Sequence, residues 1–555
     1  MIGQSERPET IIIPVSGIGD VSNTRKLILE NTLTDELKKH FRIVPQEKYE
    51  QVLEQVFQEL EYEECSEDTC IMRVQEMLQV ENVFNLQIIG EGKDSQLNLK
   101  WITLNEKRNE TDVCLGCGTF QLNDKVRGLV EKLVGGVEIK PIDVVKKENE
   151  SVTKQWTKQL GTSSYDSGEG VTTDSSGNIY LTGSTEGGLD GNTNSGKDDI
   201  FLVKYNSSGT KKWTRQLGSF SYDVGKGVST DSSGNIYLTG TTYGDLDGNT
   251  NSGEYDIFLI KYNSSGSKQW TKQLGTSSND LGMDVTTDSS GNIYVTGYTG
   301  GGLDGNTSSG EYDIFLVKYN SSGTKQWTKQ LGTSSEDWGY GVTTDLSGNI
   351  YLTGGTGGEL DGNTNSTGEE DIFLIKFNSS GTKQWTKELV TSSNDSGYGV
   401  TTDSSGNIYL TGDTGGGLDG NTNSGNKDIF LIKYNSSGTK QWTKQLGTSS
   451  NDHGWKVTTD SSGNIYVTGW TEGGLDGNTS SGSDDIFLVK YNSSGTKQWT
   501  KQLGTSSNDV GMDVTTDSSG NIYVTGYTGG GLDGNTNSGE WDIFLIKYNS
   551  SGIKQ

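Results

Sequence analysis

The sequence predicts a mainly β protein, a closed seven-bladed β-propeller of four-stranded blades that follows a small α/β domain. Two observations predict the propeller. A unit of 57 residues repeats over most of the chain, and the composition combines 79 Gly with only 4 Pro. Many short strands joined by tight turns have this composition, whereas a collagen or a typical disordered linker needs more Pro. We expect an α/β domain over residues 1–140, a linker over 141–152 and the propeller over 153–555.

Seven Trp residues mark the repeat, and each opens a W-T-[KR] segment: Trp156, Trp213, Trp270, Trp327, Trp385, Trp442 and Trp499. Their spacing is 57 residues, apart from one interval of 58 in which Thr367 is the extra residue. A fixed period of this size is the signature of a repeat architecture.

Each unit contains four predicted strands: G-V-T-T-D, N-I-Y-L-T-G, D-I-F-L-I-K-Y-N and K-Q-W-T-K-Q-L-G. The turns D-S-S-G-N and N-S-S-G-T are rich in Gly, Asn and Asp, which accept positive φ. In one third strand, Ile257 and Leu259 point to one face, while Phe258 and Ile260 point to the other. A strand that is apolar on both faces belongs to a sheet covered on both sides, as stacked propeller blades are.

The two ends of the repeated region are complementary. The region begins with a W-T-K-Q-L-G strand at residues 154–161 and stops at Gln555, one residue before the next Trp would fall. The last unit therefore supplies three strands, and the strand at residues 154–161 completes it. This pairing closes the ring and removes two exposed sheet edges. An open solenoid is the alternative, and it would not need complementary ends.

The repeated motif resembles a known family. D-[IF]-F-L-x-K-Y-N-x-x-G followed by G-x-x-x-x-D-x-G-x-x-V-x-x-D-x-x-G-N-x-Y-x-T-G is similar to the SBBP bacterial propeller repeat, over about residues 153–555. The resemblance implies a seven-bladed ring, mostly in exported bacterial proteins, without a shared catalytic activity. The L-D-G-N-T-N-S-G insertion makes the period longer than the family core.

The first domain differs from the repeats in its composition and in its predicted elements. The expected elements are a strand at 10–16, an amphipathic helix at 22–41, a second helix at 47–61, strands at 83–90 and 97–104, and a helix at 125–134. This order, with a C-S-E-D-T-C segment, resembles the N-terminal domains of TolB and related envelope lipoproteins such as CsgG. TolB places such a domain before a propeller, although its ring has six blades.

All four cysteines lie in this domain: Cys65, Cys70, Cys114 and Cys117. Four cysteines allow three disulfide pairings, of which Cys65–Cys70 with Cys114–Cys117 is the simplest. A zinc site and free thiols are the alternatives; unequal spacings and missing knuckle glycines argue against zinc. Disulfides need an oxidising compartment. We therefore expect the periplasm, the outer membrane or the extracellular space, with the cytoplasm as the alternative.

Charge and hydropathy exclude several partners. The formal net charge of −28 and the pI near 4.5 argue against nucleic acid and against anionic lipid. No apolar run approaches the roughly 18 residues of a membrane span. The start, MIGQSERPET, lacks the basic and apolar regions of a signal peptide. Export would therefore need a signal that the given chain lacks.

The sequence predicts no catalytic site. Gly17-Ile18-Gly19 lacks the third glycine of a dinucleotide-binding loop. The two histidines, His40 and His453, have no plausible Ser or Cys partner for a hydrolytic triad. Acidic pairs recur in every blade, which indicates architecture. A propeller lyase or glycosidase is the enzymatic alternative, and it would need a unique acid-base pair on one or two blades.

The loop D-G-N-T-N-S-G-x-x-D resembles calcium loops because its oxygen side chains alternate. Candidate ligands in three copies are Asp190, Asn192, Asn194 and Asp199; Asp247, Asn249, Asn251 and Asp256; and Asp533, Asn535, Asn537 and Asp542. The glycine comes one residue late and no bidentate Glu closes the loop, so any Ca²⁺ would bind weakly. The alternative is an Asx-turn ladder in which these side chains bond their own backbone.

Four positions of each unit vary widely between the copies. The first directly follows the Asp that precedes the first strand, and the second lies two residues after the first. The third follows the T-G of the second strand, and the fourth comes just before the third strand. If the G-V-T-T-D strand is innermost, all four lie on one face and the constant turns lie on the other. Predicted binding residues are Tyr255, Tyr298, Tyr312, Trp338, Tyr340, Tyr398, His453, Trp455, Trp470, Tyr527 and Trp541. Aromatic residues suit a binding face because they supply contact area at low entropy cost.

From these positions we expect Trp338, Tyr340, Tyr398, Trp455 and Trp470 to line one contiguous exposed rim. Relaxed drift in solvent-facing loops is the alternative. The leading functional interpretation is an exported, non-enzymatic binding or scaffold protein whose variable face holds a protein or glycan. A second interpretation is a cell-surface spacer in which the N-terminal domain recognises the partner.

Overall fold

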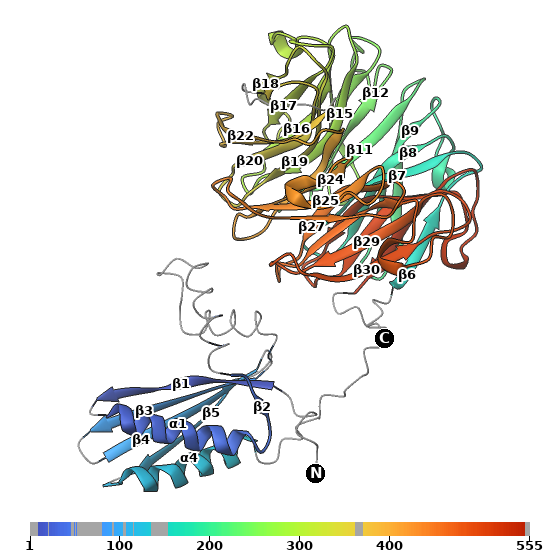
Figure 1. The fold of residues 1–555 in the computed structure, drawn as a ribbon. Helices are drawn as coiled ribbons and strands as arrows, with labels where there is room; N and C mark the ends of the chain where they lie inside the picture. Colours follow the sequence, from blue (N-terminus) through green and yellow to red (C-terminus); the bar gives the residue numbers. More distant parts are fainter. Residues whose placement is uncertain are drawn as a thin grey trace. The chain divides into compact units, whose positions relative to one another are not determined.

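The computed structural model describes residues 9–19, 21–45, 80, 82–91, 94–103, 107–114, 116–134, 154–360 and 370–549, together with Tyr49 and Val52 (Figure 1). Contacts divide the chain into two compact units, Met1–Asn149 and Glu150–Gln555. The first unit is α/β and the second is a propeller.

A five-stranded sheet with the order β2-β1-β3-β4-β5 forms the N-terminal unit. Its strands are β1 (Glu9–Gly19), β2 (Arg42–Ile43), β3 (Asn82–Glu91), β4 (Asp94–Ile102) and β5 (Lys107–Cys114), and its described helices are α1 (Asn23–Leu37) and α4 (Thr119–Val134). The expected strands and first helix are present, and β2 and β5 are additional. Helix α4 begins six residues earlier than predicted. The helix expected at 47–61 lies outside the described residues, apart from Tyr49 and Val52.

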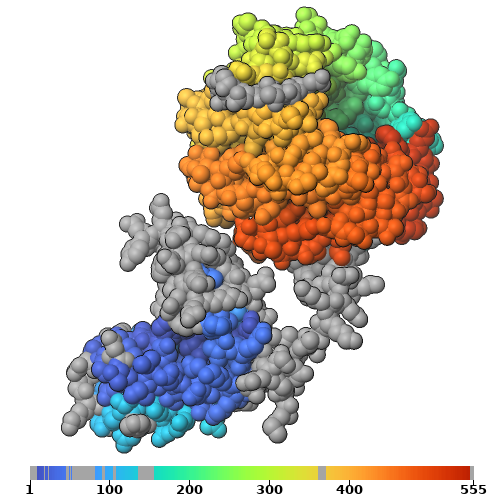
Figure 2. All heavy atoms as spheres, viewed as in Figure 1, coloured from blue at the N-terminus to red at the C-terminus, as the bar shows by residue number. Residues whose placement is uncertain are grey.

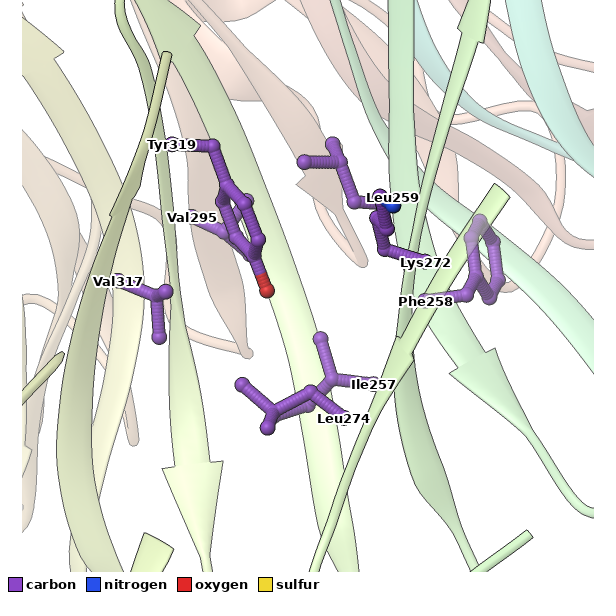
Figure 3. A pocket seen from close by; sticks show the side chains of 8 residues that line it. All are labelled: Ile257, Phe258, Leu259, Lys272, Leu274, Val295, Val317 and Tyr319. Atoms are coloured by element: carbon purple, nitrogen blue, oxygen red, sulfur yellow. The ribbon is translucent and has the colours of Figure 1, made fainter. Parts of the chain in front are cut away.

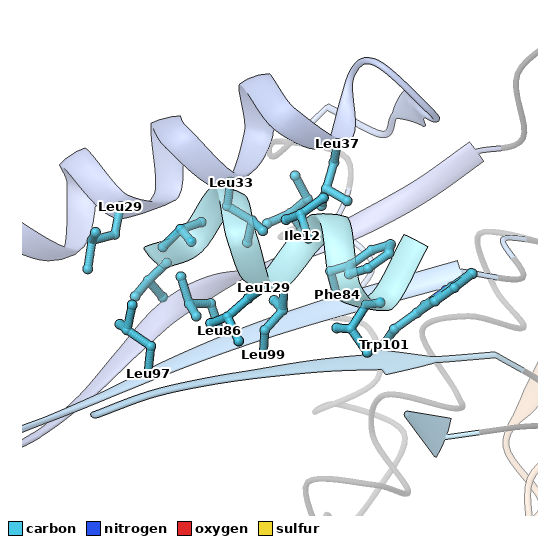
Figure 4. Packing of buried hydrophobic residues seen from close by; sticks show 14 of the residues in the cluster. Ile12, Leu29, Leu33, Leu37, Phe84, Leu86, Leu97, Leu99, Trp101 and Leu129 are labelled. Atoms are coloured by element: carbon cyan, nitrogen blue, oxygen red, sulfur yellow. The ribbon is translucent and has the colours of Figure 1, made fainter. Parts of the chain in front are cut away.

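Both helices pack on one face of this sheet, where the core lies (Figure 4). As expected of an amphipathic helix, one face of α1 supplies Leu29, Leu33 and Leu37, each fully buried. Ser22 caps α1 because its hydroxyl accepts a hydrogen bond from the backbone N–H of Arg25. The periodic apolar residues therefore attach α1 to the sheet as the sequence indicates.

The cysteines of this unit are described in part. Cys114, at the end of β5, and Cys117, just before α4, form a disulfide with a Cα–Cα distance of 5.7 Å. Cys65 and Cys70 lie outside the described residues. The bond between Cys114 and Cys117 ties the edge strand of the sheet to the start of α4.

The second unit is a seven-bladed propeller of four-stranded antiparallel sheets. Blades 1 to 3 are β7 (Asp166–Thr173), β8 (Ile179–Thr185), β9 (Asp199–Tyr205) and β10 (Lys211–Leu217); β11 (Asp223–Thr230), β12 (Ile236–Thr242), β13 (Asp256–Tyr262) and β14 (Lys268–Leu274); and β15 (Asp280–Thr287), β16 (Ile293–Thr299), β17 (Asp313–Tyr319) and β18 (Lys325–Leu331).

Blades 4 and 5 are β19 (Asp337–Thr344), β20 (Ile350–Thr356), β21 (Asp371–Phe377) and β22 (Lys383–Leu389); and β23 (Asp395–Thr402), β24 (Ile408–Thr414), β25 (Asp428–Tyr434) and β26 (Lys440–Leu446). Blade 6 is β27 (Asp452–Thr459), β28 (Ile465–Thr471), β29 (Asp485–Tyr491) and β30 (Lys497–Leu503). Blade 7 is β31 (Asp509–Thr516), β32 (Ile522–Thr528), β33 (Asp542–Tyr548) and β6 (Lys154–Leu160).

The ring closes through β6, as the complementary ends predict. Strand β6 pairs antiparallel with β33, and Leu160 lies opposite Ile543. In Figure 2 the red C-terminal blade lies beside the cyan start of the ring. Trp156 of β6 contributes to the core between blades 7 and 1, where its ring lies 6.3 Å from that of Tyr523. The closing strand therefore supplies both hydrogen bonds and apolar contact.

Apolar side chains fill the space between neighbouring blades because each third strand is apolar on both faces. Figure 3 shows one such junction, where Ile257 and Leu259 of β13 face Val295 of β16 and Val317 of β17. The space they enclose admits no water molecule. The first strands of successive blades contact one another, so they are the innermost strands of the ring.

The constant D-S-S-G-N turn is held by one aspartate side chain. Asp174 accepts hydrogen bonds from the backbone N–H groups of Ser176 and Asn178, from the Asn178 side chain and from the hydroxyl of buried Tyr180, at 2.8 to 2.9 Å. The same bonds recur in the other six blades, for example at Asp517. Folding alone therefore explains why the Asp and Asn of these turns do not vary, whereas the second residue, which makes none of these bonds, is Leu346 in blade 4 and Ser in the other copies.

Removal of the closing strand gives the first prediction. A chain of residues 162–555 should be much less stable than one of residues 150–555, because it lacks the partner of β33. The free energy of unfolding should fall by more than the ~3–5 kcal/mol that truncation of one large core side chain costs. Urea unfolding followed by circular dichroism measures the difference. Equal stabilities would show that the ring does not depend on β6.

Candidate binding face

Strand register places the four variable positions at one edge of every blade. In blade 1, Asp166 at the start of β7 lies opposite Thr185 at the end of β8, and Thr185 lies opposite Asp199 at the start of β9. Each variable position lies within three residues of one of these points. The constant turns lie at the other ends of the same strands. We call the edge that carries the variable positions the variable face.

Five aromatic rings form a continuous path across blades 3 to 6 on the variable face. The ring centroids of Tyr312 and Tyr298 are 5.3 Å apart, and those of Tyr298 and Tyr340 are 6.5 Å apart. Tyr340 lies 5.0 Å from Tyr398, which lies 4.4 Å from Trp455. Spacings of this size are typical of interacting aromatic pairs. The path crosses three blade junctions.

The remaining predicted aromatic residues lie in separate groups. Trp541 stacks on Tyr527 in blade 7 with centroids 4.5 Å apart, and Trp470 stacks on His453 in blade 6 at 4.1 Å. Tyr255 packs against Tyr243 in blade 2 at 5.1 Å. Trp338 lies opposite Gly355 in blade 4.

The expected exposed rim requires a correction. Trp338, Tyr340, Tyr398, Trp455 and Trp470 are all half-buried. Four of the five rings contact another ring, and that contact covers part of their surface. Contacts between side chains of different blades depend on the ring geometry, which the sequence pattern does not report.

A cluster of charged residues adjoins the path in blades 4 to 6. Glu370, just before β21, accepts a hydrogen bond of 2.7 Å from the hydroxyl of Ser396 in blade 5. The fully buried side chain of Asp413 binds the Lys427 ammonium at 2.9 Å and also contacts Nδ1 of His453 in blade 6. Hydrogen bonds and ion pairs thus connect three successive blades.

Burial sets the protonation of this cluster. It raises the pKa of Glu370, which Ser396 and Lys427 oppose and Asp413 reinforces. Burial, then the charge of Glu370, raises the pKa of the Tyr340 hydroxyl. Burial and the charge of Asp413 do the same for Tyr398. Both phenols therefore stay neutral beside these carboxylates.

A second charged group crosses the centre of the ring. Lys456 of blade 6 binds Asp284 of blade 3 at 2.8 Å, and Asp513 of blade 7 lies near them. Burial raises the pKa of Asp513 to about 7, although Lys456 opposes this. Asp284, Lys456 and Asp513 occupy the same position of their repeats, and the other four copies have glycine there. The sequence analysis did not select this position.

The sequence analysis also missed exposed aromatic residues. Phe220 is 75% exposed, and the other six copies have Ser at its position. Tyr222 is 37% exposed, and its hydroxyl accepts a hydrogen bond of 3.0 Å from Lys197. Both residues lie in the loop before β11, the first strand of blade 2, so they belong to the variable face. A comparison of every loop position between copies would have found them.

The predicted calcium ligands use their side chains to build the loop. The amide of Asn192 donates to the carbonyl of Leu189 at 2.7 Å, and that of Asn194 donates to Glu186 at 2.7 Å. Asp190 pairs with Lys211, while Asp199 accepts from Ser195 N–H at 2.9 Å. In the other two loops the same bonds recur for Asp247, Asn249, Asp256, Asn535 and Asp542. The amides of Asn251 and Asn537 donate to the carbonyl groups of Gly253 and Gly539. The carboxylate of Asp533 accepts a hydrogen bond from the hydroxyl of Thr157.

These contacts favour the turn interpretation of the loops. A calcium site needs six to eight oxygen atoms that face one point. Here the amide nitrogens are directed at carbonyl groups, and the two carboxylates bind different partners. Among the described residues, no group of three or more His, Cys, Asp or Glu could hold a metal ion.

Comparison with known proteins identifies the repeats. The family model "Beta-propeller repeat" (SBBP) matches seven segments, at residues 155–190, 212–247, 269–304, 326–361, 384–419, 441–476 and 498–533. The chain is an SBBP β-propeller repeat protein. Each match runs from the last strand of one blade through the first two strands of the next, and the third strands lie outside the matched segments.

Relatives are distant and longer. An uncharacterised WD repeat-containing protein of Acanthamoeba polyphaga mimivirus is 26% identical over 61% of this chain and 33% of its own length. The regulatory protein FlaEY of Caulobacter vibrioides is 27% identical over 37% of this chain and 24% of its own length. The chain thus spans a third or less of the relatives it matches.

Among solved structures, TolB from Acinetobacter baumannii is a neighbour with 12% identity and a TM-score of 0.33, covering 91% of this chain and 95% of TolB. A TM-score this low says nothing about function. In the described part of the chain, no helix is long and apolar enough to cross a membrane.

The calcium loops give a prediction. Because their side chains already bond within the loop, several millimolar calcium or an excess of chelator should leave the melting midpoint unchanged within about 1 °C. Differential scanning calorimetry measures it. A saturable rise with calcium that Asp190→Asn reduces would overturn the turn interpretation.

The central charges predict a pH dependence. The pKa of Asp513 is about 7 in the folded protein and about 3.9 in an unfolded chain, so folding takes up a proton between these pH values. Stability from this group is therefore complete at low pH and is lost as the pH rises toward about 7.

Asp513→Asn should remove this dependence of stability on pH. Between pH 4 and pH 7 the free energy of unfolding of the wild-type protein should therefore fall by about 1–2 kcal/mol relative to that of the variant. This is less than the full pKa difference would give, because solvent screening and the charge of Lys456 reduce the effect. Urea unfolding at several pH values measures it. Asp124→Asn, at a side chain that is 75% exposed, is the control. Parallel curves for wild type and Asp513→Asn would contradict the prediction.

Proposed function

We propose that this chain is a non-enzymatic binding or scaffold protein that holds a protein partner on the variable face of its propeller. The observation that carries the proposal is the aromatic path from Tyr312 to Trp455, which adjoins the charged cluster of Glu370 and Asp413. Half-buried rings with fixed positions supply contact area at low entropy cost.

The frame beneath these rings supports the same proposal. The strands of every blade keep one register, and the variable positions all lie at one edge. A rigid frame lets single side chains change without a change of fold. Rigidity also lowers the entropy that a partner's binding would cost.

We further propose that the protein works in an oxidising compartment, the periplasm, outer membrane or extracellular space. The disulfide between Cys114 and Cys117 supports this, since disulfides persist there and are rare in the cytosol.

Site-specific photo-cross-linking tests the binding face. A photoreactive residue at Tyr340 should capture a defined protein from an envelope extract, and one at Leu346 should not. Leu346 is the matched control because it is 77% exposed in the D-S-S-G-N turn of the same blade, at the opposite end of the strands, where the other six copies have Ser. Tyr398→Ala combined with Trp455→Ala should weaken the captured partner's affinity by about 2 kcal/mol or more.

Two results would contradict the proposal. Equal capture at Tyr340 and Leu346 would remove the variable face as the site. Full partner binding by residues 1–149 alone would make the propeller a spacer.

A further inference from the structure

We propose that the variable face of blades 4 to 6 recognises a cationic side chain, lysine or arginine, of the partner protein. The carboxylate of Glu370 would bind the charge, and the rings of Tyr340, Tyr398 and Trp455 would contact its apolar stem and its face. This inference rests on the proposed function and names the chemistry of the partner. We call these four residues the cation site.

Glu370 occupies a place that the sequence keeps open for it. A Cβ atom added to Gly355 would lie 1.9 Å from Oε1 of Glu370. Three other copies have Tyr or Trp at the position of Gly355: Tyr298, Trp470 and Tyr527. Glycine at 355 thus lets the carboxylate fold over blade 4 toward Ser396 of blade 5, whose hydroxyl donates to it at 2.7 Å.

The charge of Glu370 lacks a dedicated cation within the described part of the chain. Lys427 is near enough to influence it, but its ammonium binds Asp413 at 2.9 Å. Asp413 in turn also contacts His453. A half-buried carboxylate with one hydroxyl donor is costly to keep ionised, and an incoming cation would remove that cost.

Aromatic rings adjoin this carboxylate. Tyr340 and Tyr398 lie close enough for the charge of Glu370 to act on both hydroxyl groups. Tyr398 also contacts Trp455, with ring centroids 4.4 Å apart. Ammonium and guanidinium groups are attracted to the faces of such rings, and more strongly where water is partly excluded. Carboxylate and rings together fit a cation better than an anion or an apolar group.

The wider face has the complementary charge. The four variable positions of the seven copies include five acids, Glu169, Asp198, Glu370, Asp413 and Asp484, against two lysines, Lys226 and Lys427. Both lysines bind acids of this set: Lys226 binds Glu169 at 3.1 Å, and Lys427 binds Asp413. An acidic partner would therefore meet repulsion, whereas a basic segment would meet Asp198, Glu370 and Asp484, which have no ion pair within the described part of the chain.

Calorimetry with oligoarginine, oligolysine and oligoglutamate of equal length, at physiological salt and with the full chain, tests the proposal. We expect the two basic peptides to bind and oligoglutamate not to bind. Glu370→Gln should weaken oligoarginine binding by roughly tenfold or more, because it removes a half-buried charge without a change of shape. Tyr340→Leu should weaken it several-fold while the melting temperature is retained.

Glu311→Gln is the matched control. Glu311 is an exposed acid just before Tyr312, on the equivalent loop of blade 3, so its loss changes the net charge by the same amount. General attraction of basic peptides to an acidic chain would fall equally in both variants. Equal affinities of Glu370→Gln and Glu311→Gln would overturn the proposal.

Proton release gives an independent readout. The free carboxyl of Glu370 has a raised pKa, and Asp413, Asp395, Lys427 and Ser396 are the groups that act on it. A bound cation favours the ionised form, so the wild-type protein should release protons on binding at mildly acidic pH. Binding enthalpies in buffers of different ionisation enthalpy measure this, and Glu370→Gln should abolish it. Unchanged release in that variant would overturn the assignment to Glu370.

The two levels of the proposal fail separately. If cross-linking at Tyr340 captures a partner but Glu370→Gln and Glu311→Gln bind oligoarginine equally, the face is right and the cation site is wrong. If Glu370→Gln alone loses oligoarginine while Tyr340 and Leu346 capture equally, the cation site stands and the protein-binding role of the face is wrong.

Discussion

A fully buried aspartate at the start of each first strand fixes the edge of the ring on which the variable residues lie. In blade 1, Asp166 accepts hydrogen bonds from the backbone and hydroxyl of Thr162 in the preceding loop and from the hydroxyl of Thr185 at the end of β8. Burial raises its pKa, and these hydrogen bonds oppose the shift. The equivalent residues, each 0% exposed, are Asp223, Asp280, Asp337, Asp395, Asp452 and Asp509. One carboxylate per blade thus ties a loop and two strands together, independently of the variable side chains.

Constant residues hold the fold, and variable residues are free to differ. This separation of roles changes how the constancy of the repeats is interpreted. The first residues of the D-S-S-G-N and N-S-S-G-T turns stay constant because residues such as Asp174 and Asn206 bond several backbone and side-chain groups. Their constancy is a requirement of folding and says nothing about the other face. The aspartates at the variable face carry the corresponding structural role there, which leaves their neighbours free to differ. The case for binding therefore depends on how the variable residues are arranged, and less on the fact that they vary.

Much of the fold could be predicted because its causes are local and repeated. Seven copies with the same strand and turn signals predict seven blades, and the unmatched strand at residues 154–160 predicts closure. The charged strand β5 escaped prediction because K-R-N-E-T-D-V-C has no apolar alternation to mark an edge strand. The half-burial of Tyr340 and Tyr398 and the partners of Glu370 depend on distances across blade junctions. Those distances follow from the closed ring and cannot be obtained from spacing along the chain.

Several charges that break the symmetry of the ring are paired, and this bears on the drift alternative. Lys226 faces Glu169 of the neighbouring blade, and Lys456 faces Asp284 across the ring. Lys427 faces Asp413 within blade 5. Unconstrained substitution would leave half-buried charges without partners in some blades, at a cost in stability. Complementary pairs in different copies favour changes that were constrained together, while half-buried Asp198 and Asp484 have no ion pair within the described part of the chain. Glu370 also lacks an ion pair within the described part of the chain, because Lys427, the lysine that acts on it, binds Asp413. The proposed recognition of a basic side chain would give this carboxylate a role.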